Sequence, residues 1–116
     1  MRIATIGLLA ACVGGCGASL PAPNTEWAEA SNDVGKAEAG GAPDVPDARL
    51  HLELAQEKLQ ESKKLIDQDN RRAASLVAVA RVEAQLALSL AKAQKAQATA
   101  RQAEDDLQKA KKAGGQ

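Results

Sequence analysis

Apolar residues recur at alternating spacings of four and three residues along two successive segments of the chain. The first series is Ala48, Leu52, Ala55, Leu59, Ser62 and Ile66, and the second is Ala73, Val77, Ala80, Ala84, Ala87 and Ala91. This heptad spacing is typical of helices that pack against each other in a coiled coil. If the second segment folds back on the first, the paired members have residue numbers that always add up to 139. We therefore predict an all-α fold, a long antiparallel helical hairpin over residues 46–113 with its turn near residues 67–70.

Turn and capping residues support this division. Pro46 suits the first position of a helix, where its missing N–H leaves nothing unpaired. Asp69 or Asn70 can cap the following helix by accepting a hydrogen bond from a backbone N–H. Larger aliphatic side chains flank the paired series and widen the apolar face enough for another helix or a second copy: Leu54, Leu65, Leu76, Val79, Leu86 and Leu90.

A shorter helix is predicted over residues 25–39, with Asn24 or Thr25 as its cap. Its apolar residues form one stripe, namely Trp27, Ala30, Val34 and Ala37. The sequence GGAPDVP at residues 40–46 then ends this helix, because glycine and proline do not continue one.

The charge distribution suggests where this short helix packs. Residues 20–50 contain six acidic and two basic side chains and so carry a net charge of −4. Residues 92–116 contain three acidic and six basic side chains, which gives +3. We expect the short helix to pack beside residues 92–116, the alternative being that both segments are solvated faces whose ion pairs stabilise little.

The composition excludes several classes of function. At 116 residues the chain forms at most one small domain, and it contains one Trp and no Tyr or Phe. Its 15 basic and 15 acidic residues cancel. Nucleic-acid binding depends on positive charge and on aromatic stacking, so we expect no nucleic-acid partner. Alanine and leucine, both strong helix formers, supply most of the apolar residues and favour long helices.

The first residues resemble an export signal that ends in a lipidation motif. MRIATIGLLAACVGG has one Arg, a short apolar run and then small residues, which is the order found in secretory signals. The run is too short to span a bilayer, which needs about 20 apolar residues. Both LAAC, ending at Cys12, and VGGC, ending at Cys16, resemble the bacterial lipobox, which implies acylation of the cysteine and cleavage before it. The alternatives are a disulfide between the two cysteines, or cysteines without a role in a discarded signal.

We favour Cys16 as the lipidated residue and keep Cys12 as the alternative. LAAC is the closer match to the motif, but cleavage there leaves a signal of only 11 residues. Cleavage before Cys16 gives a signal over residues 1–15 and removes Cys12, so that no free thiol enters an oxidising compartment. Residues 16–24 then form the lipidated cysteine and a flexible tether with two Pro and one Gly. Resemblance to enterobacterial lipoproteins implies the outer membrane, because residue 17 is Gly rather than Asp.

The helical part of the chain resembles a family as well. GAPDVPDARLHLELAQEKL followed by RRAASLVAVARVEAQLALSLAKA is similar to small bacterial lipoproteins that carry an Ala/Leu-rich helical domain of unknown function. The turn of that domain commonly contains Gly, whereas this chain has Asp69 and Asn70 there. Some relatives continue into an OmpA-like peptidoglycan-binding domain. We find no such domain in this sequence, so the binding activity cannot be carried over, and proximity to peptidoglycan is the expectation that remains.

No group of residues predicts catalysis or metal binding. His51 is the only histidine and has no second ligand at a converging spacing, which favours a residue on the helix surface. Glu104, Asp105 and Asp106 look like a solvated face, since acid–base catalysis needs a pocket that shifts a pKa. We expect no enzyme activity, cofactor, metal or small-molecule substrate. The candidate partner-interface residues are Trp27, Leu76, Leu86 and Leu90, where Trp27 can instead cover the stripe of the short helix.

These observations favour a non-enzymatic envelope lipoprotein, a membrane-tethered helical rod that acts as a structural spacer or scaffold in the periplasm. Its expected partners are the membrane, through the N-terminal lipid, and a second copy or another protein. The alternative is an accessory or adaptor subunit that binds an envelope enzyme or an efflux or assembly complex through its Leu-rich helix face.

Overall fold

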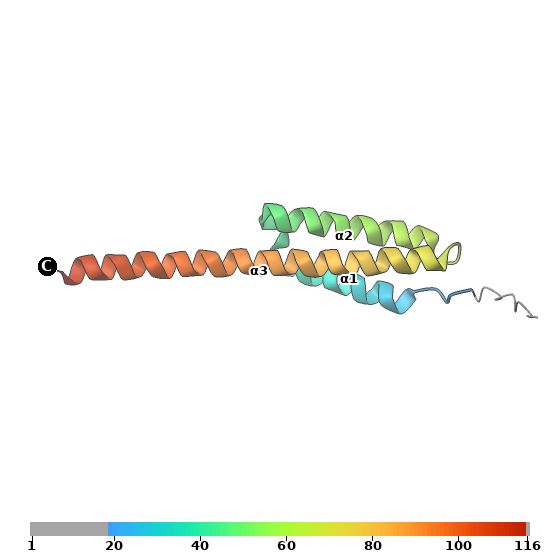
Figure 1. Ribbon diagram of the computed structural model, residues 1–116, viewed down its shortest axis with the longest axis horizontal. Helices are drawn as coiled ribbons and strands as arrows, with labels where there is room; N and C mark the ends of the chain where they lie inside the picture. Colours follow the sequence, from blue (N-terminus) through green and yellow to red (C-terminus); the bar gives the residue numbers. More distant parts are fainter. Residues whose placement is uncertain (1–18, 116) are drawn as a thin grey trace, which may run out of the picture.

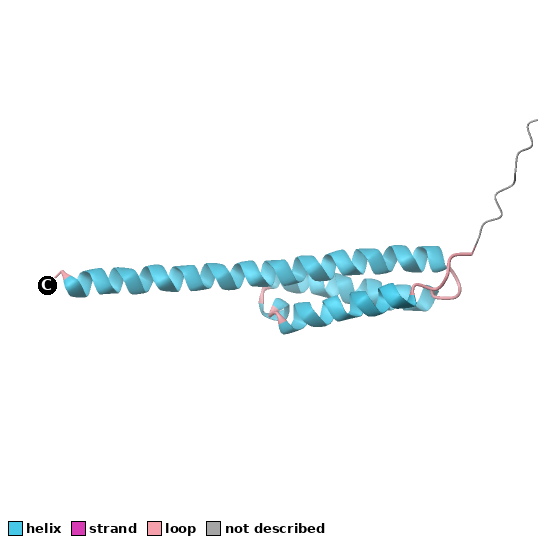
Figure 2. Ribbon diagram, turned by 90° about the horizontal axis from the view of Figure 1, so that it is seen from below, coloured by secondary structure: helices cyan, strands magenta, loops and turns pink. Residues whose placement is uncertain are grey.

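The computed structural model describes residues 19–115, which contain helices joined by turns and loops and no strand (Figures 1 and 2). Helix α1 spans Asn24–Ala39, a short 3-10 helix η1 spans Ala42–Asp44, α2 spans Pro46–Leu65 and α3 spans Asn70–Gly114. The predicted fold, an all-α antiparallel hairpin preceded by a short helix, is confirmed. The predicted signal and both cysteines lie outside the described residues.

Helices α2 and α3 pack side by side through the two predicted apolar series. The buried residues of α2 are Ala48, Leu52, Ala55, Leu59 and Ser62, and those of α3 are Ala73, Val77, Ala80, Ala84, Ala87 and Ala91. Ile66, the last member of the first series, is only half-buried because it follows the end of α2. The Ser62 hydroxyl donates a hydrogen bond to the Leu59 carbonyl at 2.7 Å, so its burial leaves no unpaired polar group. Most interface residues are alanine, whose short side chain lets the two helices approach closely.

Asp and Asn side chains shape the turn between α2 and α3 without any glycine. Asp67 adopts the left-handed backbone conformation with φ 69°, which Asp tolerates better than most residues. Asp69 caps α3 by accepting a hydrogen bond from the Arg72 N–H at 3.0 Å, as predicted. The Asn70 side chain accepts from the Asp67 N–H at 2.8 Å and donates to the Leu20 carbonyl at 2.7 Å. Asn70 therefore ties the segment before α1 to the turn.

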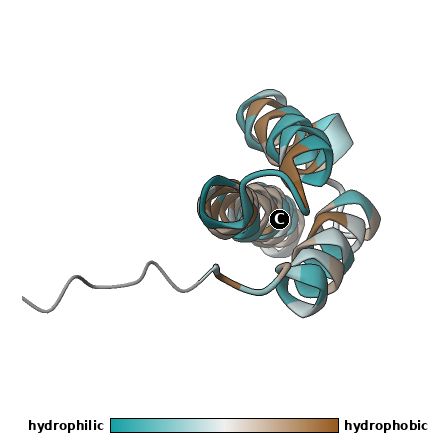
Figure 3. Ribbon diagram, turned by 90° about the vertical axis from the view of Figure 1, so that its right-hand side faces the viewer, coloured by the Kyte–Doolittle hydropathy of each residue, from teal (hydrophilic) through white to brown (hydrophobic). Residues whose placement is uncertain are grey.

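Helix α1 folds back along the hairpin and does not reach the end of α3. Its buried residues Ala30, Val34 and Ala37 belong to the same core as the interface of α2 with α3. Seen end-on, the three helices surround this core (Figure 3). Residues 92–115 are exposed along their whole length. The prediction that α1 packs beside residues 92–116 is therefore wrong.

Burial of apolar surface explains where α1 packs. Beside the hairpin α1 contacts both α2 and α3, whereas beside the end of α3 it would contact one helix only. Each buried CH2 group contributes about 0.8 kcal/mol, while an exposed ion pair contributes about 1 kcal/mol at most. The apolar stripe of α1 therefore outweighs the attraction between distant charges. The start of α1 also differs from the prediction, because Pro23 precedes the helix and no side chain caps it.

Two glycines allow the tight connection from α1 to α2. Gly41 has a left-handed φ of 94°, where a side chain would be strained. Gly40 lies so close to α3 that a β-carbon there would overlap the side chain of Leu88. The connection thus holds the end of α1 against α3, next to the start of α2.

Helix α3 extends far beyond the other helices (Figure 1). It has 45 residues where α2 has 20, and Ala91 is its last buried residue. At a rise of 1.5 Å per residue, α3 is about 67 Å long, and its exposed residues 92–114 account for about 35 Å. We call residues 92–115 the arm and residues 24–91 the body.

Replacing Ala80 by Leu should destabilise the body, because Ala80 is fully buried between α2 and α3 and a larger side chain overpacks the interface. We expect a loss of about 1–3 kcal/mol in the free energy of unfolding, measured by urea denaturation. Ala78→Leu is the matched control, because Ala78 is exposed on the same helix and Ala and Leu are both strong helix formers. Equal stability of the two variants would show that the interface is loosely packed.

Candidate functional site

The residues singled out in the sequence lie in separate parts of the molecule. Cys16 and the alternative Cys12 lie outside the described residues, so lipidation stays a prediction. Trp27 lies on α1, while the three candidate leucines lie on α3. The structure therefore does not gather these residues into one site.

Trp27 links α1 to α2. Its indole Nε1 donates a hydrogen bond to the Leu59 carbonyl at 3.2 Å, and its half-buried ring packs against the core. The ammonium group of Lys63 lies 5.3 Å from the ring centroid, within the range of cation–π attraction. These contacts make Trp27 part of the docking of α1 within the chain.

The three leucines of α3 differ in their exposure. Leu76 and Leu90 are half-buried, and Leu90 packs against the core. Leu86 is 40% exposed, and the nearby Val79 and Val82 are 45% and 64% exposed. Of the three leucines, Leu86 is the one most available to a partner.

A polar cluster around Asp33 joins α1 to α3. Asp33 accepts hydrogen bonds from Arg81 Nε at 3.3 Å and from Gln85 Nε2 at 3.2 Å, and it pairs with Lys36 at 3.0 Å. Arg81 also pairs with Glu29 at 2.8 Å. Burial acts to raise the pKa of Asp33, but the hydrogen bonds from Lys36 and Gln85 and the charges of Lys36 and Arg81 together hold it below its usual value of 3.8. The negative charge of residues 20–50 was the only sequence signal for this cluster, and it suggested the wrong end of α3.

A second polar contact joins α2 to α3. His51 Nδ1 lies 2.6 Å from Glu83 Oε2, and about a quarter of each side chain is exposed, 27% for His51 and 25% for Glu83. Sequence reasoning placed His51 on the helix surface without a partner. The hairpin register could have identified Glu83 as the partner of His51. Each of the two residues directly precedes a member of the paired series, so both lie on the same flank of the interface between α2 and α3. One imidazole and one carboxylate do not complete a metal site, and no group of three potential ligands occurs among residues 19–115.

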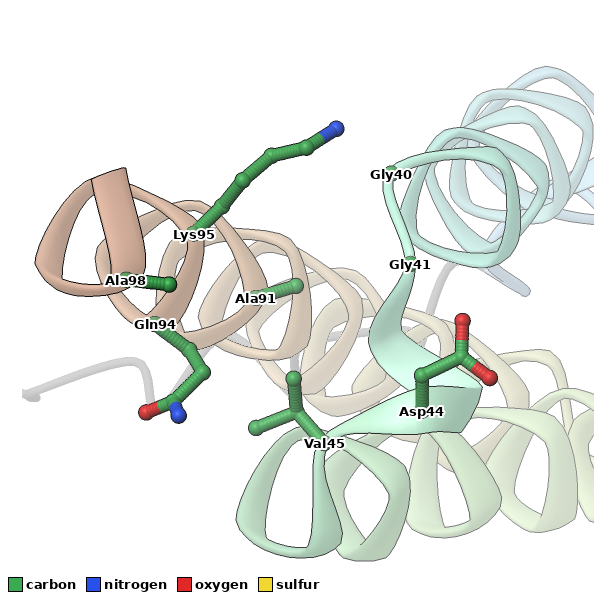
Figure 4. A pocket seen from close by; sticks show the side chains of 8 residues that line it. All are labelled: Gly40, Gly41, Asp44, Val45, Ala91, Gln94, Lys95 and Ala98. Carbon is green, nitrogen blue, oxygen red and sulfur yellow. The ribbon is translucent and has the colours of Figure 1, made fainter. Parts of the chain in front are cut away.

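A shallow hollow lies where the body meets the arm (Figure 4). It has a volume of about 230 Å³ and is lined by Gly40, Gly41, Asp44, Val45, Ala91, Gln94, Lys95 and Ala98. The side chains of Lys95 and Asp44 extend from different walls (Figure 4). Acid–base catalysis needs a group within hydrogen-bond reach of the reacting proton in a pocket that shifts its pKa, and this open hollow contains no histidine, serine or cysteine.

The acidic residues of the arm form ordinary contacts of a helix surface. Asp106 accepts a hydrogen bond from Gln102 at 3.0 Å and lies 3.8 Å from Lys109. All these side chains are exposed, so they are open to water.

By length and composition alone, α3 is apolar enough to cross a membrane. The core helix of a soluble protein passes the same test, and α3 buries six residues against its neighbours. Arg81 and Glu83 also lie within its most apolar part, and charges at the depth of a bilayer are costly. The two charges argue against a membrane span, although only 28% of the apolar window is buried in the described structure.

Comparison of the chain with protein-family models, curated proteins and solved structures finds no match. A function can therefore be inferred from three features, namely the rod-like α3, its exposed arm and its exposed apolar residues.

Replacing Asp33 by Asn should weaken the docking of α1 at neutral pH, because it removes the charge beside Arg81. We expect a loss of less than about 1 kcal/mol in the free energy of unfolding, since the cluster lies at the surface. The pKa of Asp33 is lowered in the folded state, so its contribution is full above the unfolded pKa of about 3.9 and is lost as the pH falls through the lower folded value.

The difference in stability between wild type and Asp33→Asn should therefore shrink as the pH is lowered from 7 to 3. Urea denaturation followed by the fluorescence of Trp27, the single tryptophan, measures it. Asp105→Asn on the exposed arm is the control and should change stability little at either pH. A difference that grows toward acid pH would contradict the assigned role of Asp33.

Proposed function

We propose that the chain is a non-enzymatic envelope lipoprotein, a helical rod tethered to the membrane through a lipid on Cys16, which acts as a spacer or scaffold in the periplasm. The lipobox-like VGGC and the tether with its two prolines support this proposal. Gly17 supports the outer membrane, by the resemblance to enterobacterial lipoproteins.

The positions of the two ends of the rod carry the proposal. The Leu20 carbonyl is hydrogen-bonded to Asn70 at the start of α3, so the chain enters the body at the end where α2 turns into α3. The arm ends at the opposite end of α3 (Figure 1), about 67 Å away. A lipid on Cys16, four residues before Leu20, would hold the turn near the membrane and direct the arm of a single molecule away from it.

The arm offers surface to other molecules along its whole length. Residues 92–115 are exposed on all sides, and an uninterrupted helix of this length is a semi-rigid spacer. Proximity to peptidoglycan, a second copy and another protein are all compatible with a rod of this shape. The proposal therefore assigns the anchor to one end and contacts with partners to the other.

Replacing Cys16 by Ser should release the protein from the membrane fraction, because no lipid can then be attached. Cys12→Ser is the matched control and should leave the protein in the membrane, since Cys12 is expected to be removed with the signal. Cell fractionation measures the first effect, and mass spectrometry of the membrane form should find a lipid-modified N-terminal peptide that begins at Cys16. A peptide that begins at Cys12, or an unmodified Cys16, would refute the anchor.

A second candidate function is that of an adaptor subunit for an envelope enzyme or an efflux or assembly complex. The exposure of Leu86 beside Val79 and Val82 favours it. Affinity purification of the full chain from envelope extracts distinguishes the two. One partner in fixed stoichiometry, lost in Leu86→Glu and kept in the arm variant Gln94→Glu, would support the adaptor, whereas a scaffold should show no such single partner.

A further inference from the structure

Helix α3 carries a second heptad series on its exposed side. The residues are Val79, Val82, Leu86, Ser89, Ala93, Ala96, Ala100, Ala103, Leu107 and Ala110, at alternating spacings of three and four. All ten are exposed. Four of the six exposed large hydrophobic residues in the described chain belong to this series, namely Val79, Val82, Leu86 and Leu107. We call these ten residues the outer seam.

The outer seam faces away from both neighbouring helices. In the body each of its members lies two residues after a buried residue, as Val79 follows Val77 and Leu86 follows Ala84. Two residues turn a helix by about 200°, so the outer seam lies on the side of α3 opposite α2. Helix α1 does not cover it either, because α1 contacts α3 at Arg81 and Gln85, which lie outside the series.

We propose that the outer seam binds a second copy of this chain in antiparallel orientation. In that orientation the paired members have residue numbers that add up to 189, and the two-fold axis lies between Gln94 and Lys95. Every member then has a partner, from Val79 opposite Ala110 to Ala93 opposite Ala96. The overlap of residues 79–110 is about 47 Å long.

The size of the side chains favours the antiparallel over the parallel orientation. Antiparallel pairing sets Val79 and Leu86 opposite alanines, and Ala93 opposite Ala96, so that most layers contain at least one small residue. Parallel pairing instead sets each large residue opposite its own copy, with Leu86 and Leu107 as wide layers separated by a run of alanines. The distance between two packed helices depends on the contacting side chains. Pairs of one large and one small residue keep that distance more even along the interface.

Charge complementarity favours the same orientation. The antiparallel axis lies three to four residues beyond Ala91, the last buried residue of the body, so each arm lies along the body of the other copy. Residues 92–116 have six basic and three acidic side chains, net +3, and residues 20–50, which include α1, have two basic and six acidic ones, net −4. Within one chain these segments meet where residues 40–47 lie beside residues 94–98, whereas α1 itself folds back beside Arg81. Parallel pairing would place the two positive arms side by side.

The inference goes beyond the proposed anchor and does not depend on it, because it rests on the described helices alone. Ala100→Glu tests it, since Ala100 is exposed in the single chain and faces Ser89 of the second copy in the proposed pairing. Ala98→Glu is the matched control, because it makes the same change two residues away on a face of the arm outside the outer seam.

Sedimentation equilibrium of the full chain in a mild detergent should give a dimer for the wild type and for Ala98→Glu. Dimerisation of Ala100→Glu should be at least tenfold weaker, with the helical content and unfolding of the body unchanged. A monomeric wild type, or a dimer that Ala100→Glu leaves intact, would overturn the proposal whatever the state of the lipid.

Disulfide cross-linking tests the orientation. In the full chain with Cys12→Ser and Cys16→Ser, one variant carries Ser89→Cys and another carries Ala100→Cys. A mixture of the two should form cross-linked dimers on oxidation, because these positions face each other. Ser89→Cys alone should not, since its two copies lie 11 residues apart along the axis, about 16 Å. Efficient linkage of Ser89→Cys alone would show a parallel dimer and overturn the proposed pairing.

Discussion

The close contact between α2 and α3 through alanine is the interaction on which the rest of the structure depends. Each alanine buries only one methyl group, so the interface gains stability by running along the whole of α2, from Ala48 to Ser62. A two-helix contact of this kind still leaves much apolar surface open at its flanks. Helix α1 covers one flank with Ala30, Val34 and Ala37, and the 3.2 Å hydrogen bond from Trp27 to the Leu59 carbonyl fixes it to α2.

The position of α1 also decides what remains exposed. Because its stripe is buried in the body, two of its acidic residues, Glu29 and Asp33, pair with Arg81 and not with the basic arm. The arm is left as a single helix whose residues are all exposed. In proteins a helix usually gains most of its stability from packing of an apolar face. In the arm, the outer seam is the face that carries apolar residues at helical spacing.

The features that could be predicted from the sequence are those that depend on near neighbours or on one repeated spacing. The two buried series, Pro46 at the start of α2 and Asp69 as the cap of α3 are of this kind. The contacts of Asp33 with Arg81 could not be predicted, because they depend on the direction in which α1 runs relative to α3. That direction follows from a competition between apolar burial and long-range charge, and a net charge per segment does not show which one wins. The contact of His51 with Glu83 could have been predicted, because it follows from the hairpin register alone.

The proposed dimer and the proposed lipid anchor together constrain how the rod would meet a membrane. In the antiparallel dimer the two turns, each near residue 70, lie 49 residues apart along the common axis, about 74 Å. Each tether of residues 17–23 reaches at most about 25 Å. Two lipids at opposite ends cannot both enter one membrane if the rod stands upright on it. An anchored dimer must therefore lie along one membrane or join two facing surfaces, whereas an anchored single chain is free to stand upright with its arm extended.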